Sequence, residues 1–149
     1  KAEYERLAEY LRDHPETNFF HFNVDLAQGP CVIKRLRGCG AGCEYVAITP
    51  EGDIYPCHQF VGNEDYKLGS LYDGTFDQEL SGRFAGLNIY TREECRDCWA
   101  RFYCSGGCSA SNLLVNGDIK KPHRVGCELE RKRLECAIAL RAIAAGMAE

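Results

Sequence analysis

The residues of this chain that could do chemistry are its cysteines, of which there are ten among 149 residues. The tightest group follows the pattern C-x2-C-x5-C-x3-C and consists of Cys95, Cys98, Cys104 and Cys108. Thiolates this close in sequence can converge on a metal with little loss of chain entropy, and a C-x2-C pair commonly supplies two ligands to one metal centre. Gly106 and Gly107 precede the last cysteine and would let the backbone approach inorganic sulfide.

A second, looser group contains Cys39, Cys43 and Cys57, and Cys127 stands alone further along the chain. Cys127 lies just before a predicted helix, whose N-terminal end would favour a thiolate. The eight cysteines amount to two sets of four ligands. Two iron–sulfur clusters and two structural zinc sites both fit such a set. Disulfides fit less well, because a chain of this length can build its own core.

Three further residues have the chemistry of ligands but a different expected role. Cys136 falls on the apolar stripe of the last predicted helix, which indicates a buried core thiol. Cys31 precedes a strand-like Val32-Ile33 and is predicted to be a plain thiol, with a substrate-facing role as the alternative. His58 follows Cys57 directly, and we expect it at the surface or beside a ligand rather than on the metal.

Two strands are predicted to position the first cysteine group. Residues 45–48 and 53–55 have strand character, and Thr49-Pro50-Glu51-Gly52 between them suits a type I turn. The resulting hairpin would carry Cys43 and Cys57 near each other. A further strand is predicted over residues 19–26, which are rich in aromatic and β-branched side chains.

Helices are predicted at both ends of the chain. Residues 3–13 are amphipathic and end before Pro15. Residues 128–147 form a longer pattern, in which Leu129, Cys136, Leu140, Ile143 and Met147 share one face. A shorter helix could begin at a capping box over residues 91–94. The predicted fold is a small α+β domain with a β-hairpin at the first cysteine group and a long C-terminal helix.

Composition excludes several classes of protein. A formal net charge of -4 does not suggest a nucleic-acid partner. No apolar run approaches the ~18 residues of a membrane span, and no signal peptide opens the chain, so we expect a cytoplasmic protein without a membrane partner. Residues 1–28 are predicted to be a connector, and residues 29–149 the domain itself.

The cysteine pattern resembles a known motif. Cys39, then Gly52-x4-Cys57, then C-x2-C-x5-C-x3-C from Cys95, then Cys127 resembles the seven-cysteine SPASM motif of radical S-adenosylmethionine (SAM) enzymes that modify ribosomal peptides. Residues 34–42 and 44–62 are most similar to maturases that form thioether crosslinks in Cys-rich peptides, the SCIFF or ranthipeptide group.

The resemblance implies two auxiliary [4Fe–4S] clusters, serving electron transfer or binding of a substrate thiol. It assigns the first cluster to Cys39, Cys57 and Cys108. It assigns the second to Cys95, Cys98, Cys104 and Cys127. The group often lacks a cysteine at position 43. Ligation by Cys43 is the default expectation here, because a thiolate near an unfilled iron gains a strong bond, and an open iron is the alternative.

The resemblance also implies a larger enzyme with a Cys-rich precursor peptide as its partner. A radical SAM barrel of the same protein would bind SAM and a third [4Fe–4S] cluster. The signature C-x3-C-x2-C is absent here: its third position holds Val46 after Cys43 and Ser111 after Cys108. We therefore expect a C-terminal part that does not cleave SAM alone. A zinc-binding interaction module, and a SPASM domain serving another peptide modification, are the alternative functions.

Overall fold

The computed structural model describes residues 1–26 and 32–147, and Cys31, predicted to be a plain thiol, lies outside the described residues. The chain forms two compact units: unit 1 combines Lys1–Cys31 with Arg124–Glu149, and unit 2 is Val32–His123. Helices and an antiparallel sheet are both present, so the predicted α+β class is confirmed. No helix in the described part of the chain has the length and apolar character needed to cross a membrane.

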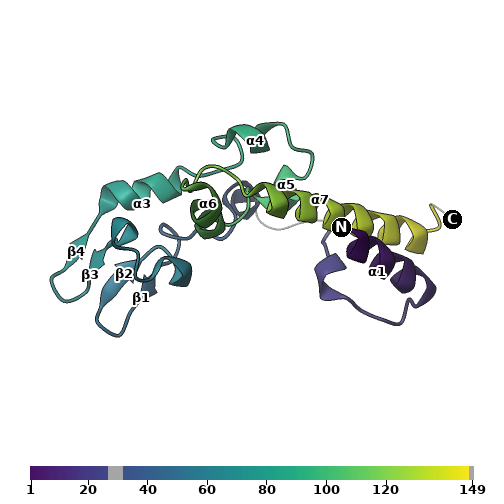
Figure 1. Ribbon diagram of the computed structural model, residues 1–149, viewed down its shortest axis with the longest axis horizontal. Coiled ribbons are helices and arrows are strands. Elements are labelled where there is room, and N and C mark those ends of the chain that lie inside the picture. Colours follow the sequence, from purple (N-terminus) through teal and green to yellow (C-terminus); the bar gives the residue numbers. More distant parts are fainter. Residues whose placement is uncertain (27–31, 148–149) are drawn as a thin grey trace. The chain divides into compact units, whose positions relative to one another are not determined.

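Unit 1 is built from the two ends of the chain. Helix α1 (Ala2–Asp13), predicted from its amphipathic pattern, lies along helix α7 (Arg124–Ala144) (Figure 1). The core between them consists of Leu11, Phe22, Cys136 and Ala137. The prediction of a buried Cys136 is confirmed: its side chain is 7% exposed, and its Sγ lies 3.6 Å from the carbonyl oxygen of Tyr4.

The strand predicted over residues 19–26 was wrong, because this segment contains the short 3-10 helix η1 (Phe20–Phe22). Its aromatic rings pack on one another and on α1: Phe19 meets Phe22 edge-on at 5.2 Å between ring centres, and Tyr4 lies 5.6 Å from Phe22. The aromatic content that suggested a strand therefore serves a side-chain cluster. The strands of the described residues lie in unit 2 and pair with one another.

Helix α7 begins four residues before its predicted start, which places Cys127 inside the first turn rather than ahead of it. The predicted apolar stripe holds only in the middle of the helix. Leu134, Cys136 and Ala137 are buried, whereas Leu129 and Met147 are 40% and 80% exposed. The helix packs on α1 through its centre, so the two ends of the stripe remain accessible.

Unit 2 contains a four-stranded antiparallel sheet of order β1-β2-β3-β4 (Figure 1). Its strands are β1 (Ala47–Ile48), β2 (Asp53–Tyr55), β3 (Gly69–Ser70) and β4 (Thr75–Phe76). The predicted hairpin is confirmed, since β1 pairs with β2 and the Gly52 amide donates to the Thr49 carbonyl at 2.9 Å. The first cysteine group therefore flanks a real hairpin.

Unit 2 also contains short helices: α2 (Val32–Arg37), η2 (His58–Phe60), η3 (Glu64–Tyr66), α3 (Gln78–Ala85), α4 (Glu93–Arg96), α5 (Arg101–Cys104) and α6 (Ser109–Asn116). Val32-Ile33, predicted to be strand-like, instead begins α2, whose Leu36 carbonyl accepts the Ile89 amide at 3.0 Å. Helix α4 forms where a capping box was predicted, but Thr91 does not cap it. The Thr91 hydroxyl instead donates to the Gly86 carbonyl at 3.0 Å.

The core of unit 2 joins the sheet to α3 and α6. Phe60 meets Phe84 of α3 edge-on at 5.4 Å between ring centres. The buried side chains of this core are Ile54, Tyr55, Cys57, Phe60, Leu68, Leu80, Phe84, Leu87, Ala110 and Ile119. Cys57 is thus anchored in the core directly after β2, and Ala110 brings the start of α6 to the same place.

Candidate metal centre

The loop of Cys39 and Cys43 is fixed against the residue that precedes Cys57. The Gly42 amide donates both to the Tyr45 carbonyl at 2.9 Å and to the Pro56 carbonyl at 3.0 Å. Gly42 has φ +78°, and a Cβ at this position would lie 2.8 Å from the Phe84 ring, so only glycine fits the turn. Residues distant in sequence are brought together here by backbone hydrogen bonds.

Three of the candidate ligands of the first site are close enough to act on one another electrostatically. Burial raises the pKa of the Cys57 thiol, and the charges of Cys108 and Cys39 raise it further, although backbone amides of η2 oppose the shift. The Tyr45 hydroxyl donates to Cys39 Sγ at 3.8 Å. Desolvation, this bond and the charges of the same three cysteines raise the pKa of Tyr45 to about 12. The structure therefore brings Cys39, Cys57 and Cys108 together.

Cys108 has the surroundings of a stable thiolate. It is the N-cap of α6, so its sulfur lies at the positive end of a helix. Partial desolvation of its sulfur raises the pKa of Cys108, but hydrogen bonding from the Ser111 amide and hydroxyl, the Ala110 amide and Gln59 outweighs this effect, and the pKa is lowered overall. The Gln59 amide nitrogen lies 3.8 Å from Cys108 Sγ.

The residue pattern predicts a helix N-terminus at Cys127 but not the one that the structure has at Cys108. The available signal was the pair Gly106-Gly107 before the segment and Gly117 after it, which bracket an eight-residue helix. Gly117 is its left-handed C-cap, with φ +70°.

Cys43 lies in the same loop as Cys39, but its thiol is directed elsewhere. The side chain is exposed, and Sγ donates to the Gly40 carbonyl at 3.3 Å. His58, next to Cys57, is exposed in η2, as the sequence indicated. Cys43 is therefore present at the edge of the first site with its thiol bonded to its own loop.

The cysteines of the second group lie in or beside the consecutive short helices α4 and α5. Cys95 is buried in α4, Cys98 follows this helix and Cys104 ends α5. Hydrogen bonds between successive turns join them, since the Cys98 amide donates to the Cys95 carbonyl at 3.1 Å and the Arg101 side chain donates to the Cys98 carbonyl at 3.0 Å. The backbone path between these ligands is thereby fixed.

A left-handed link connects the two groups. Ser105, Gly106 and Gly107 all have positive φ, at 57°, 86° and 72°, and they join Cys104 to Cys108. A Cβ at Gly38 would lie 3.5 Å from the Ser105 side chain, so the Cys39 loop runs beside this link. The Arg92 guanidinium is buried against it, with one nitrogen on the Gly106 carbonyl and another 2.9 Å from Ser109 Oγ.

Cys127 belongs to unit 1, where it is half-buried in the first turn of α7, and its carbonyl accepts the Arg131 side chain at 3.1 Å. Across the described residues, no three His, Cys, Asp or Glu side chains form a group that could hold a single metal ion. The eight candidate ligands are all thiols, and thiolates are the donors of both iron–sulfur clusters and zinc.

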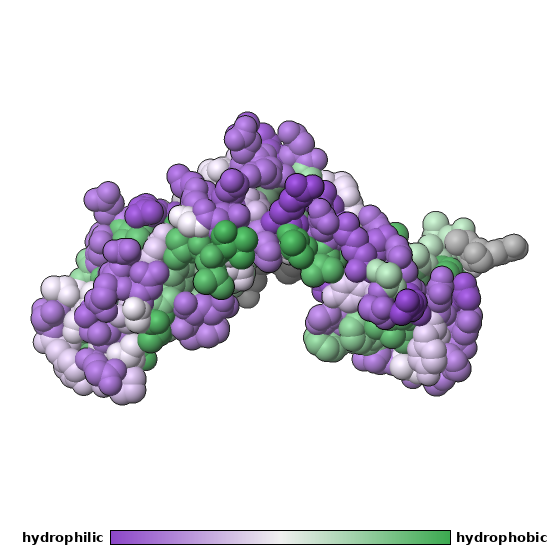
Figure 2. All heavy atoms as spheres, in the orientation of Figure 1, coloured by the Kyte–Doolittle hydropathy of each residue, from purple (hydrophilic) through white to green (hydrophobic). Residues whose placement is uncertain are grey.

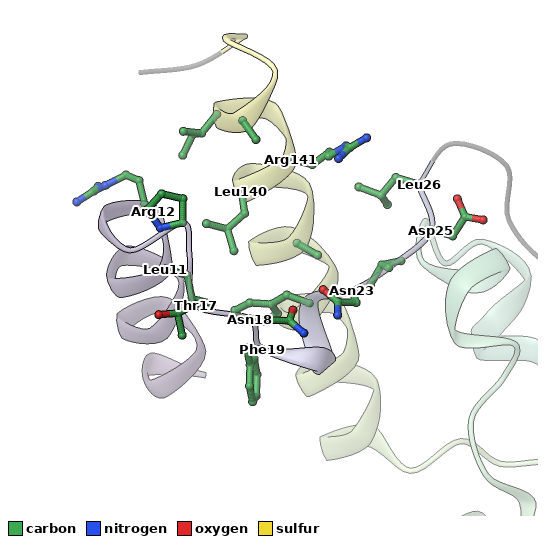
Figure 3. Close-up of a pocket in the computed structure, with 16 residues that line it drawn as sticks. Leu11, Arg12, Thr17, Asn18, Phe19, Asn23, Asp25, Leu26, Leu140 and Arg141 are labelled. Atoms are coloured by element: carbon green, nitrogen blue, oxygen red, sulfur yellow. The ribbon is translucent and has the colours of Figure 1, made fainter.

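A pocket of about 570 Å³ is found in unit 1. It lies between α1, the segment 15–26 and α7 (Figure 3). Leu11 and Leu140 contribute apolar surface to it, Arg12 and Arg141 contribute charge, and none of the described cysteines lines it. The described lining of this pocket therefore contains none of the candidate ligands.

Comparison with known proteins assigns the region around these cysteines. Residues 39–99 match SPASM, an iron–sulfur cluster-binding domain. This match confirms the predicted SPASM resemblance and takes in five of the candidate ligands, namely Cys39, Cys43, Cys57, Cys95 and Cys98.

Relatives match about two thirds of the chain. An uncharacterized protein of Archaeoglobus fulgidus is 31% identical over 101 residues, which are 65% of this chain and 24% of that protein. The mycofactocin maturase of Mycobacterium ulcerans is 32% identical over 111 residues, or 70% and 29%. A PqqA peptide cyclase of Xanthomonas axonopodis pv. citri is 28% identical over 102 residues, or 64% and 27%. The matched part of the chain spans about a quarter of the length of these relatives.

Proposed function

We propose that this chain is the auxiliary-cluster domain of a radical SAM enzyme that forms thioether crosslinks in a Cys-rich ribosomal peptide. The observation that carries the proposal is the gathering of Cys39, Cys57 and Cys108, which are distant in sequence, beside a region that matches an iron–sulfur cluster-binding domain. The relatives named as a maturase and a peptide cyclase support a peptide substrate.

The proposed ligand sets divide the cysteines between two [4Fe–4S] clusters. Cys39, Cys57 and Cys108 would hold the first cluster. Because the Cys43 thiol is bonded to the Gly40 carbonyl, we propose that one iron of this cluster is open or exchangeable, with Cys43 as its nearby candidate ligand. The second cluster would be held by Cys95, Cys98, Cys104 and Cys127.

When bound, such clusters supply one-electron transfer and, at an open iron, a site for a thiolate. The chain itself provides the sulfur ligands and sets their surroundings. Cys57 is a buried anchor, and Cys108 is stabilised as a thiolate by the amides of α6 and by Gln59. Tyr45 and Gln59 donate to ligand sulfurs, and hydrogen bonds of this kind reduce the charge on sulfur and raise the cluster potential.

The exposure of the first site supports access by a substrate. Cys39, Cys43 and Cys108 are exposed, whereas Cys57 is buried. One side of the site would therefore be anchored in the core, and the other would admit a cysteine of the precursor peptide. SAM and the third [4Fe–4S] cluster would be bound by the radical SAM barrel of the same protein.

A second candidate function keeps both clusters but changes the product. The relatives include a peptide cyclase and a mycofactocin maturase, so a modification other than a thioether would also fit the SPASM region. Mass spectrometry of the precursor peptide after reaction with the complete enzyme separates the two. A thioether consumes the free thiol of a peptide cysteine, whereas a modification at other residues leaves that cysteine open to alkylation.

The test of the metal centre is analysis of protein prepared without oxygen and with iron supplied. We expect about eight irons and about eight sulfides per chain, a brown colour and absorption near ~400 nm. Stoichiometric zinc in place of iron, in colourless protein, would contradict the proposal and support the zinc-binding interaction module.

A further inference from the structure

Arg92 is a buried cation placed between the two cysteine groups. Its side chain is 3% exposed. One guanidinium nitrogen donates to the Gly106 carbonyl and another donates to Ser109 Oγ at 2.9 Å. Both acceptors flank Cys108 in the sequence, and the Arg92 carbonyl accepts the amide of Cys95 at 3.0 Å. One residue therefore contacts the backbone of both groups.

The backbone at Gly106 packs closely against the Arg92 side chain. Gly106 has φ +86°, and a Cβ there would lie 3.1 Å from Arg92 Cδ and 3.3 Å from its nearest guanidinium nitrogen. Any side chain at position 106 would therefore press on the arginine as well as strain the backbone. The left-handed link between Cys104 and Cys108 leaves room for the cation.

Among the described residues, no carboxylate is hydrogen-bonded to the buried guanidinium of Arg92. Its acceptors are a carbonyl and a hydroxyl, and its Nε is buried without a hydrogen-bond partner. Burial lowers the pKa of Arg92, and the charges that act most strongly in the other direction are those of Cys95, Cys104 and Cys108. Asp118 acts less than these thiols. Because a buried charge is costly unless it is compensated, the Gly106 carbonyl and the Ser109 hydroxyl compensate Arg92 by hydrogen bonding, and the nearby thiols are the strongest source of compensating charge.

We propose that Arg92 is the shared counter-charge of both cluster sites and that it raises the reduction potential of both clusters. The inference rests on the proposed function, because it takes Cys95 and Cys104 as ligands of one cluster and Cys108 as a ligand of the other. Reduction of either cluster takes one electron from an external reductant and adds one negative charge to the site. A fixed cation beside the ligands stabilises the more negative, reduced state.

The experiment is a reductive titration of the cluster-loaded chain with a low-potential chemical reductant, followed by electron paramagnetic resonance. In Arg92→Gln, we expect the ratio of reduced to oxidised cluster at a fixed solution potential to fall about tenfold for both clusters, which is about 59 mV for a one-electron couple. Arg92→Lys keeps the charge and should stay close to the parent. Arg83→Gln removes the same charge from an exposed position on α3, and solvent screening should leave both potentials unchanged.

The outcomes separate this inference from the proposed function. If the parent protein binds no iron, the proposed function is contradicted. Loaded Arg92→Gln with parental potentials, or a shift confined to one cluster, would overturn the shared counter-charge alone. If Arg92→Gln cannot retain its clusters, retention by Arg92→Lys supports the counter-charge. An equal shift or equal loss in both variants contradicts it, because the guanidinium would then act through packing on Gly106.

Discussion

The gathered cysteines of the first site have contrasting surroundings. Cys57 lies in the hydrophobic core, where burial raises its pKa and favours the neutral thiol. Cys108 occupies the N-cap position of α6, and hydrogen bonding from Ser111, Ala110 and Gln59 holds its pKa below the ordinary value. Metal ligation requires the thiolate. Cys108 is therefore the candidate ligand whose surroundings already favour the thiolate, whereas Cys57 would need the charge of a bound metal to favour its thiolate.

The proposed open iron of the first cluster predicts the effect of a single substitution. Cys43→Ala should retain the parental iron and sulfide content and the parental electron paramagnetic resonance signal, because the Cys43 thiol is bonded to the Gly40 carbonyl. Cys39→Ala is the matched control from the same loop, and it should lose the first cluster. Loss of iron from Cys43→Ala, or a new affinity for added thiol, would identify Cys43 as a ligand.

The left-handed link gives a second prediction at a single residue. In Gly106→Ala, the alanine would be strained at φ +86°, and its Cβ would also displace the Arg92 side chain. Gly62 is a matched control, because it has φ +84° and a Cβ there meets nothing within 4 Å. Gly62→Ala should cost ~1–2 kcal/mol, and Gly106→Ala should lower the apparent thermal midpoint of the loaded protein by several degrees more. Equal midpoints would show that the contact with Arg92 has no energetic weight.

Individual elements show which sequence signals were sufficient. The hairpin was predictable because Thr49-Pro50-Glu51-Gly52 encodes its turn locally. The start of α7 was not, because Gly126 argues against a helix interior, yet it is tolerated in a first turn. The segment 19–26 failed as a strand because its aromatic residues pack on α1, a tertiary contact that a local pattern cannot contain.

Helix α7 carries two cysteines with different expected roles, which allows a matched comparison. Cys127→Ala should lose about half of the iron, because it removes a proposed ligand of the second cluster. Cys136→Ala should keep all the iron but cost about 1 kcal/mol of stability in the packing of α1 on α7. Iron analysis with hydrogen exchange of both helices measures the two effects. Full iron in Cys127→Ala, or lost iron in Cys136→Ala, would reverse the assignment.

At the scale of the whole molecule, the sequence pattern alone could not predict which cysteines and helices that are distant in sequence lie close together. The pattern identified the eight candidate ligands, but spacing would place Cys108 with Cys95, Cys98 and Cys104. The union of Cys108 with Cys39 and Cys57 depends on the Gly42 hydrogen bonds and on the position of α6. Unit 1 likewise joins the two ends of the chain through contacts that have no local signature. Both features were accessible only through a family resemblance or through the structure.

Unit 2 also has an exposed apolar surface that the sequence pattern did not predict. Leu114 and Val115 of α6 are exposed, and Figure 2 shows hydrophobic side chains at the surface around this helix. The same helix positions Cys108 at its N-cap and buries Ala110 in the core. Helix α6 therefore carries a candidate metal ligand at its N-cap and an exposed apolar surface at Leu114 and Val115.

The cysteine spacings of the whole chain predict that it does not cleave SAM by itself. Although it carries eight candidate ligands, the chain lacks C-x3-C-x2-C, because Val46 and Ser111 occupy the third cysteine positions. The 149-residue chain, loaded with its clusters and chemically reduced, should therefore yield no 5′-deoxyadenosine from SAM and show no tight SAM binding in calorimetry. A complete radical SAM enzyme under the same conditions is the positive control. Release of 5′-deoxyadenosine by this chain, abolished by replacement of one of its own cysteines, would show that one of its clusters cleaves SAM and would overturn the auxiliary role.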